Sequence, residues 1–222
     1  MTLHQWKEFL SDRDRRLELV LSLVLLVLTL TVLTRFLIFV EHRPGVVLDD
    51  PLLRRFQPID LTWLTFSLIY GSILAGIVTL LPRPARLTFA LQLYLMMVLS
   101  RMLVMYLLPL EPPTHLILLS DPVVEFFGTG QTLTRDLFFS GHTSTLFILF
   151  LVAEGPLRRA VFLLLTLAVA TTLLLQHAHY TVDVVAAFFF CYANFALLCR
   201  LRRDPDDSHC GLTTALPSAG RK

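Results

Sequence analysis

Charged residues are scarce in this chain of 222 residues. Asp, Glu, Lys and Arg together make up 16% of it, whereas soluble domains contain about 25%. The net charge of +2 gives no reason to expect nucleic acid as a partner. Cysteine is also scarce: Cys191, Cys199 and Cys210 contain no CxxC pair, so the sequence predicts neither a disulfide framework nor a metal knuckle.

Apolar residues are correspondingly abundant. They make up 55% of the chain, and the mean hydropathy is +0.68. Crossing a bilayer core of about 30 Å takes roughly 20 helical residues. Six apolar blocks of 17–24 residues are close to that length: Leu17–Val40, Leu61–Leu81, Leu87–Leu110, Leu137–Ala153, Ala160–Gln176 and Tyr180–Cys199. The sequence therefore predicts an all-α fold, a six-transmembrane helical bundle that forms one catalytic domain over residues 17–200.

The two flanks of this domain are polar. Residues 1–16 carry charges of alternating sign and predict a short cytoplasmic segment at the membrane interface. The first apolar block is too long for the core of a signal peptide and lacks a small-residue cleavage site, so we expect a retained helix. Residues 201–222 are rich in Pro, Ser and Thr and predict a disordered cytoplasmic tail.

Basic residues indicate the orientation of the bundle. Loops that carry Lys and Arg are usually cytoplasmic. Thirteen basic residues lie in the N-terminal segment, the 82–86 and 154–159 turns and the C-terminal tail, against four in the loops at 41–60 and 111–136. We therefore expect both termini to be cytoplasmic, and the two longer loops to lie on the extracytoplasmic face.

Two histidines should meet near that outer face. His142 lies near the start of the fourth block, and His179 precedes the sixth. The 37 residues between them fit one helix inward, a short turn and one helix back. Asp183 lies one helical turn after His179, where a carboxylate can hold one imidazole nitrogen and leave the other free as a nucleophile. This pattern predicts a histidine–carboxylate pair opposite a second histidine.

Arginines inside the apolar blocks need a partner. Arg101 lies too deep in the third block to reach the interface easily, and such residues usually face the bundle interior. A phosphate group is a suitable partner for its guanidinium. Arg35 lies closer to a membrane interface, so we expect it to extend toward water instead.

Simpler interpretations exist for each of these polar residues. His142 alone could be a helix–helix hydrogen-bonding residue. His177 and His179 suggest a metal pair, but residues two apart on a helix point in nearly opposite directions. Asp136 and Arg135 could be a solvated pair at a helix start. Tyr106, Trp63 and Tyr180 could be interfacial aromatics. The catalytic interpretation depends on the joint pattern of His142, His179, Asp183 and Arg101.

Three stretches resemble the signature motifs of the sphingomyelin synthase family, a branch of the type-2 phosphatidic acid phosphatase superfamily. They are DLFFSGHT at 136–143, HYTVDVV at 179–185 and RMLVMYLLPLEPP at 101–113. The resemblance implies catalytic roles for His142, His179 and Asp183. It implies substrate-binding roles for a further set: Arg101, Tyr106, Asp136, Ser140, Gly141 and Tyr180.

The resemblance also implies a reaction. His179 would attack a glycerophospholipid such as phosphatidylcholine or phosphatidylethanolamine, form a phosphohistidine and release diacylglycerol. An acceptor lipid alcohol, ceramide in the family or else diacylglycerol, would then take the headgroup, with His142 serving as acid and then base. Neither a metal nor an organic cofactor is implied. The active site would face the periplasm or lumen, and the sequence leaves a homo-oligomer open.

Departures from the motifs keep an alternative open. Lipid phosphatases of the superfamily carry an arginine six residues before the nucleophile, where this chain has Leu173. The loss of a cation favours a phosphodiester substrate over a phosphomonoester dianion. Ala178 replaces an acidic residue linked to headgroup choice, and Ser100 stands where the family has a second arginine. A lipid hydrolase on the same scaffold, with water as acceptor, is the alternative function; a non-catalytic membrane protein is the third.

Overall fold

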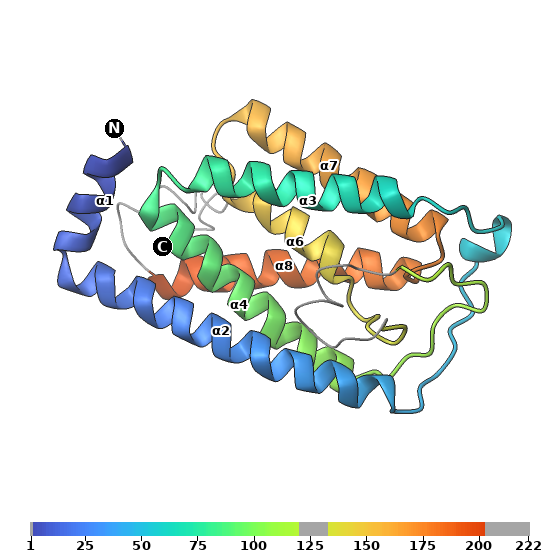
Figure 1. The fold of residues 1–222 in the computed structure, drawn as a ribbon. Coiled ribbons are helices and arrows are strands. Elements are labelled where there is room, and N and C mark those ends of the chain that lie inside the picture. Colours follow the sequence, from blue (N-terminus) through green and yellow to red (C-terminus); the bar gives the residue numbers. More distant parts are fainter. Residues whose placement is uncertain (1, 120–132, 203–222) are drawn as a thin grey trace, which may run out of the picture.

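The computed structural model describes residues 2–119 and 133–202, which are all-helical apart from connecting loops and one isolated β-bridge between Val46 and Leu110 (Figure 1). The helices are α1 (Thr2–Ser11), α2 (Arg13–Glu41), the single 3₁₀ turn η1 (Leu53–Arg55), α3 (Thr62–Leu80), α4 (Pro84–Leu107), α6 (Gly141–Val152), α7 (Pro156–Leu175) and α8 (Thr181–Arg202). Residues 201–202 of the predicted tail belong to α8; the rest of the tail, with Cys210, lies outside the described residues.

Five helices are long and apolar enough to cross a membrane: α2, α3, α4, α7 and α8. They correspond to five of the six apolar blocks, and an integral membrane protein is therefore supported. The helix starts follow local chemistry. Asp12 caps α2 by accepting hydrogen bonds from the backbone N–H groups of Asp14 and Arg15, and Pro84 and Pro156 occupy the first turns of α4 and α7.

The fourth block forms a shorter helix than the sequence predicted, so the count of six membrane spans is not confirmed. Residues 137–140 are not helical, and α6 begins only at Gly141. Its 12 residues would extend about 18 Å at roughly 1.5 Å per residue, well short of a bilayer core. The cause lies at Ser140, whose side chain caps α6, and in the preceding backbone, which is held by Arg101.

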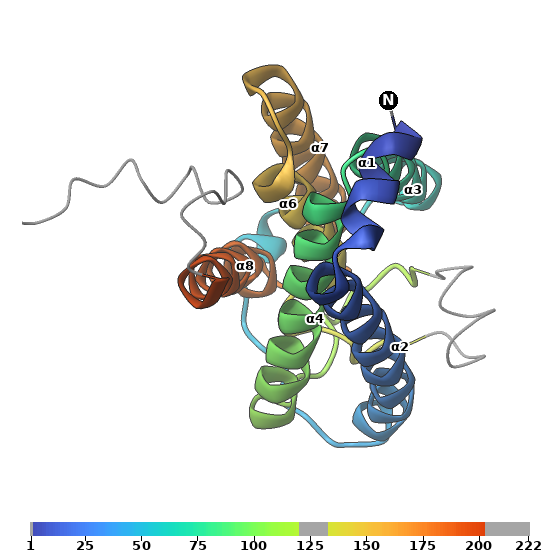
Figure 2. The same ribbon diagram turned by 90° about the vertical axis from the view of Figure 1, so that its left-hand side faces the viewer.

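The central helix of the bundle is α4. It packs against α2, α6 and α8, and in Figures 1 and 2 it lies between α2 and α3. Its fully buried Phe89 and Leu93 belong to the largest apolar cluster, together with Phe195 of α8 and Leu151 of α6. This placement brings the deep arginine of α4, Arg101, next to the start of α6.

The connections separate into two ends (Figure 1). The long-loop end contains the loops at 42–61, 108–119, 133–140 and 176–180, whereas the short-turn end contains the α3–α4 and α6–α7 turns beside α1. Asp136, Ser140, His179 and Tyr180 belong to the loops of the long-loop end, and Gly141 and His142 form the start of α6 that follows one of them. The expected cytoplasmic location of both termini is not tested by the structure alone.

The cysteines differ in part from the sequence prediction, which gave no disulfide framework. Cys191 is a buried free thiol, as its apolar block predicts, but Cys199 is disulfide-bonded. Cys199 lies in the last turns of α8, at the short-turn end.

Candidate active site

A cavity of about 270 Å³ lies inside the bundle toward the long-loop end. Apolar side chains from α2, α3 and α4 form much of its wall, and polar groups from α4, α6 and the loops before α6 and α8 gather in it. The lining residues are Leu33, Leu37, Ile69, Tyr70, Ile73, Tyr94, Met97, Val98, Arg101, Asp136, Gly141, His142, Thr145 and His179. The two histidines of the sequence motifs therefore line the same space.

His179 is held by the start of α8. Its Nδ1 lies 3.3 Å from Oδ2 of Asp183, and the same oxygen accepts a hydrogen bond from the backbone N–H of Tyr180 at 2.9 Å. Asp183 is fully buried, and its Oδ1 has no hydrogen-bond partner among the described residues. A carboxylate on Nδ1 fixes that nitrogen as the protonated one and leaves Nε2 with a free lone pair.

His142 occupies the second position of α6. Ser140 is the N-cap, and its Oγ accepts a hydrogen bond from Thr143 N–H. The imidazole of His142 lies edge-on to the ring of Phe66, with centroids 6.5 Å apart. A helix N-terminus favours negative charge, so α6 presents its positive end on the side where His142 borders the cavity.

Arg101 ties α4 to the segment before α6. Its Nε donates to the carbonyl of Phe139 at 2.6 Å, and Nη2 donates to Oδ1 of Asp136 at 2.5 Å. Nη1 has no partner among the described residues, and the side chain lines the cavity. The buried guanidinium thus orders the approach to α6 and still has one nitrogen available for a ligand.

The close contact between the first turn of α6 and Arg101 requires glycine at position 141, because a side chain would not fit there. A Cβ on Gly141 would lie 3.0 Å from Cζ of Arg101 and 3.2 Å from Nη1. Any larger residue would therefore displace the guanidinium or the first turn of α6. The glycine of the SGHT motif lets the charge of Arg101 reach the cavity beside His142.

The loop between α2 and α3 caps α8 from a distance. Asp50 accepts hydrogen bonds from the backbone N–H of Thr181 at 2.6 Å and from its hydroxyl at 3.1 Å. Burial raises the pKa of Asp50, but the hydrogen bonds from Thr181, Leu52 and Leu53 outweigh it and hold the pKa below its usual value. A carboxylate 131 positions away therefore fixes the turn that carries His179.

Tyr180 connects the turn that carries His179 to two further loop segments. The hydroxyl of this fully buried residue donates to the carbonyl of Glu111 at 3.0 Å and accepts from Leu48 N–H. Burial raises the pKa of the Tyr180 phenol. The Glu111 carboxylate in turn accepts from Gly45 N–H and from Arg135, which lower its pKa. Three loops thus converge on the residue that follows His179.

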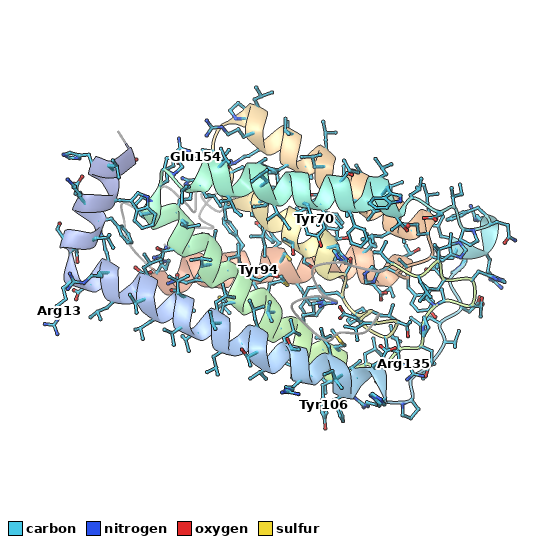
Figure 3. The ribbon with its side chains drawn as sticks, in the orientation of Figure 1. Arg13, Tyr70, Tyr94, Tyr106, Arg135 and Glu154 are labelled. Carbon is cyan, nitrogen blue, oxygen red and sulfur yellow. The ribbon has the colours of Figure 1, made fainter. Side chains whose placement is uncertain are left out.

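The structure brings only part of the predicted substrate-binding set into the cavity. Arg101, Asp136 and Gly141 line it. Ser140 is a buried helix cap, and Tyr180 is a buried loop tie outside it. Tyr106 lies at the edge of the bundle, as Figure 3 shows. The Cζ atom of Arg43 lies 5.1 Å from the centre of its ring. The exposed side chain of Arg35 also lies outside the cavity.

Several residues of the site escaped the sequence analysis. Tyr70 and Tyr94 lie within the bundle on α3 and α4 and line the cavity with Thr145 (Figure 3). Their blocks are apolar on every face, so periodicity gives no signal for which side faces a cavity. Asp50 also escaped, since its contact with α8 is tertiary. Among the described residues, no group of three His, Cys, Asp or Glu side chains could hold a metal ion.

Five helices are of membrane length, and three of them (α2, α3 and α4) line an internal cavity that also contains polar groups. These features support an integral membrane protein with an internal polar site. Residues 135–199 match the family model described as PAP2 superfamily C-terminal. The matched stretch includes His142, His179 and Asp183. The match supports the type-2 phosphatidic acid phosphatase superfamily, and with it a lipid phosphatase or phosphotransferase scaffold. Comparison with curated proteins gives no match.

Proposed function

We propose that the protein is an integral membrane phosphotransferase that moves a phospho-headgroup from a glycerophospholipid to an acceptor lipid alcohol, ceramide or a similar lipid. The observation that carries the proposal is the shared cavity: His142, His179 and Arg101 line one space whose lining also includes leucine, isoleucine, methionine and valine side chains. Polar groups that can transfer a phosphoryl group thus adjoin a wall that suits acyl chains.

In the first half-reaction, Nε2 of His179 attacks the phosphorus of the donor lipid. The P–O bond to diacylglycerol breaks as the P–N bond forms, and His142 gives its proton to the leaving oxygen. Asp183 stabilises the positive charge that develops on the His179 ring. Arg101, through Nη1, compensates the charge on the phosphoryl oxygens.

In the second half-reaction, the acceptor alcohol takes the place of diacylglycerol. His142, now neutral, removes the hydroxyl proton as the alcohol oxygen attacks phosphorus and the P–N bond breaks. His179 recovers its lone pair and His142 its proton, so the enzyme returns to its starting state. One cavity serves both lipids in turn because the headgroup stays on His179 between the two steps.

The charge of the cavity favours a phosphodiester donor. Among the described residues that line the cavity, Arg101 is the only Lys or Arg, and it already forms an ion pair with Asp136. Leu173, where the superfamily's phosphatases carry an arginine, is fully buried in an apolar cluster with Val169 and Leu146. One shared cation suits a phosphodiester monoanion better than a phosphomonoester dianion.

Labelled lipids test the proposal directly. Purified protein with headgroup-labelled phosphatidylcholine or phosphatidylethanolamine and ceramide should form a new sphingophospholipid. His179→Ala, His142→Ala and Asp183→Ala should each lower the rate by about 10²–10⁴-fold, the contribution of a positioned acid–base group. His4→Ala, with an exposed side chain on α1 at the other end of the bundle, is the matched control. Full turnover by His179→Ala would contradict the mechanism, and release of free phosphocholine without transfer would instead show a hydrolase.

A further inference from the structure

Two adjoining hollows lie at the long-loop end, apart from the catalytic cavity. One has a volume of about 270 Å³ and the other of about 730 Å³. They share Leu48, Asp49, Asp50 and Tyr180, and neither shares a lining residue with the cavity that contains His142. Together they form one groove, here called the α8 groove, that runs from the 47–55 segment to the first turns of α8.

The smaller hollow contains a buried histidine with an unused nitrogen. His177 is 4% exposed, and its Nε2 has no hydrogen-bond partner among the described residues. A buried ring nitrogen without a partner is costly. In the tautomer protonated on Nδ1, Nε2 is an acceptor and suits a ligand that brings an N–H or O–H group.

Two aspartates and two arginines line the α8 groove, and among the described residues only Asp49 and Arg54 form an ion pair. Asp49 pairs with Arg54 at 3.1 Å, and Asp50 accepts its hydrogen bonds from Thr181 and the 52–53 backbone. Arg55 lines the larger hollow and has no ion-pair partner among the described residues. An arginine in this position is suited to a phosphate.

The rest of the larger hollow is apolar and faces outward from the bundle. Val182 and Val185 of α8 are 45% and 47% exposed, and Leu48, Pro51 and Leu52 complete the wall. Since α8 is long and apolar enough to cross a membrane, these exposed valines of its first turns suit contact with an acyl chain. The groove thus contains an apolar surface and a cation in its larger hollow, an unpartnered imidazole nitrogen in its smaller hollow, and the Asp50 carboxylate in both.

We propose that the α8 groove binds a phosphatidylethanolamine molecule at a second lipid site, distinct from the catalytic cavity. One acyl chain lies on Val182 and Val185, the phosphate meets Arg55, and the ammonium group donates toward His177 and Asp50. Tyr180 walls both hollows and directly follows His179, so a lipid bound here contacts the corner that holds the nucleophile. The inference does not depend on the proposed reaction.

Photo-crosslinking tests this site. The full-length His179→Ala protein, which leaves the lipid unconsumed, is placed in phosphatidylcholine nanodiscs with a small share of phosphatidylethanolamine bearing a diazirine acyl chain. Mass spectrometry of the irradiated protein should find label on residues 47–55 and 181–188. Arg55→Gln should lower that label about tenfold, as loss of one charge-assisted hydrogen bond predicts. Val185→Trp, which fills the groove, should lower it without changing charge.

Two control variants match Arg55→Gln and Val185→Trp. Arg43→Gln, at the same end but outside the groove, and Val161→Trp, on an equally exposed part of α7, should leave the label unchanged. Exchanging part of the phosphatidylcholine matrix for unlabelled phosphatidylethanolamine should lower the label, because phosphatidylcholine lacks N–H donors and leaves the site to the probe. Label spread evenly over lipid-facing helices, label insensitive to both groove variants, or label unchanged by unlabelled phosphatidylethanolamine would each overturn the proposal. Label on α2 and α3 peptides reports the catalytic cavity separately.

Discussion

The size of Gly141 controls how closely α6 approaches Arg101. A methyl group at this position would lie 3.0 Å from Cζ of the guanidinium, which is fixed on its other side by Asp136 and Phe139. We expect Gly141→Ala to displace the guanidinium or tilt His142. Transfer activity should fall by about 10²-fold, the effect of a small misplacement of catalytic groups, while the helical content measured by circular dichroism stays the same.

The control for this substitution is Gly71→Ala. Gly71 lies within α3, and a Cβ there would meet nothing within 4 Å. Alanine at that position should raise helix stability by about 0.5–1 kcal/mol through backbone entropy and leave the activity unchanged. Equal activity of the two variants would show that the contact between Gly141 and Arg101 has no part in catalysis.

Glu111 should make the long-loop end sensitive to acid. Hydrogen bonds from Gly45 and Arg135 hold its pKa in the folded protein below the ordinary value of 4.5. The stabilisation is therefore complete above about pH 4.5, where the unfolded chain is also ionised, and is lost as the pH falls through the lowered folded pKa. Glu111→Gln should melt at a lower temperature than the wild type at pH 7, and the difference should shrink toward pH 3.

The melting series needs a glutamate outside the loops as its reference. Glu8 lies on the exposed side of α1 at the short-turn end, with a side chain that is 76% exposed. Glu8→Gln should reproduce the wild-type dependence of melting temperature on pH. A constant difference between Glu111→Gln and the wild type from pH 7 to pH 3 would contradict the role assigned to the carboxylate charge.

At the scale of elements, the first turn of α8 depends on a loop far away in the chain. Asp50 supplies the acceptor for Thr181, in the role of an N-cap residue. Asp50→Asn keeps an oxygen but loses the charge that favours a helix N-terminus, so we expect a loss of about 0.5–1 kcal/mol of stability. Because the same turn carries His179, kcat should fall several-fold while KM stays nearly constant.

Asp60→Asn is the control that separates the loss of a helix cap from the displacement of His179. Asp60 accepts a hydrogen bond from Thr62 N–H at the start of α3, in the same long loop, and does not touch α8. This variant should lose a similar small amount of stability and keep its kcat, measured as initial transfer rates in lipid micelles. If Asp50→Asn and Asp60→Asn lower kcat equally, Asp50 affects the reaction only through general stability. In that case Asp50→Glu, which keeps the charge, should be no faster than Asp50→Asn.

Sequence patterns predicted the long elements well and the short ones poorly. Five apolar blocks became membrane-length helices because length and hydropathy are properties of the local sequence. The block from Leu137 did not become helical at its start, since Arg101 holds the backbone of the 136–139 segment through contacts across 35–38 positions. Such contacts leave no trace in local composition.

The candidate site also contains residues that the sequence predicted and residues that only the packing of the helices places there. The motifs placed His142, His179 and Arg101 near one another, and all three line one cavity. Tyr106 lies five residues after Arg101, and this spacing turns its ring to the outside of α4. Tyr70 and Tyr94 belong to uniformly apolar helices, so only packing around α4 shows that they line the cavity. Proximity along the chain therefore predicted the charged groups but not the aromatic wall.

At the scale of the whole molecule, every described loop tied to the His179 corner belongs to one end of the bundle. Asp50, Glu111 and Arg135 come from three separate loops, and the short-turn end contains Arg83, Arg86 and Glu154 as its own ion-pair cluster. The excess of basic residues at the short-turn end favours a cytoplasmic location for it. The catalytic cavity would then open toward the periplasm or lumen.

Single cysteines at the two ends test this orientation. In a chain whose own cysteines are replaced by alanine, Arg54→Cys marks the long-loop end and Arg158→Cys the α6–α7 turn; both side chains are exposed. A membrane-impermeant maleimide should label the cysteine at position 54 in intact cells or sealed outer-face-out vesicles, and the one at 158 only after permeabilisation. The reverse pattern would place the cavity on the cytoplasmic side and require a cytoplasmic-leaflet lipid as donor. Labelling of both positions before permeabilisation would contradict a membrane-spanning bundle, because its two ends cannot then be separated by lipid.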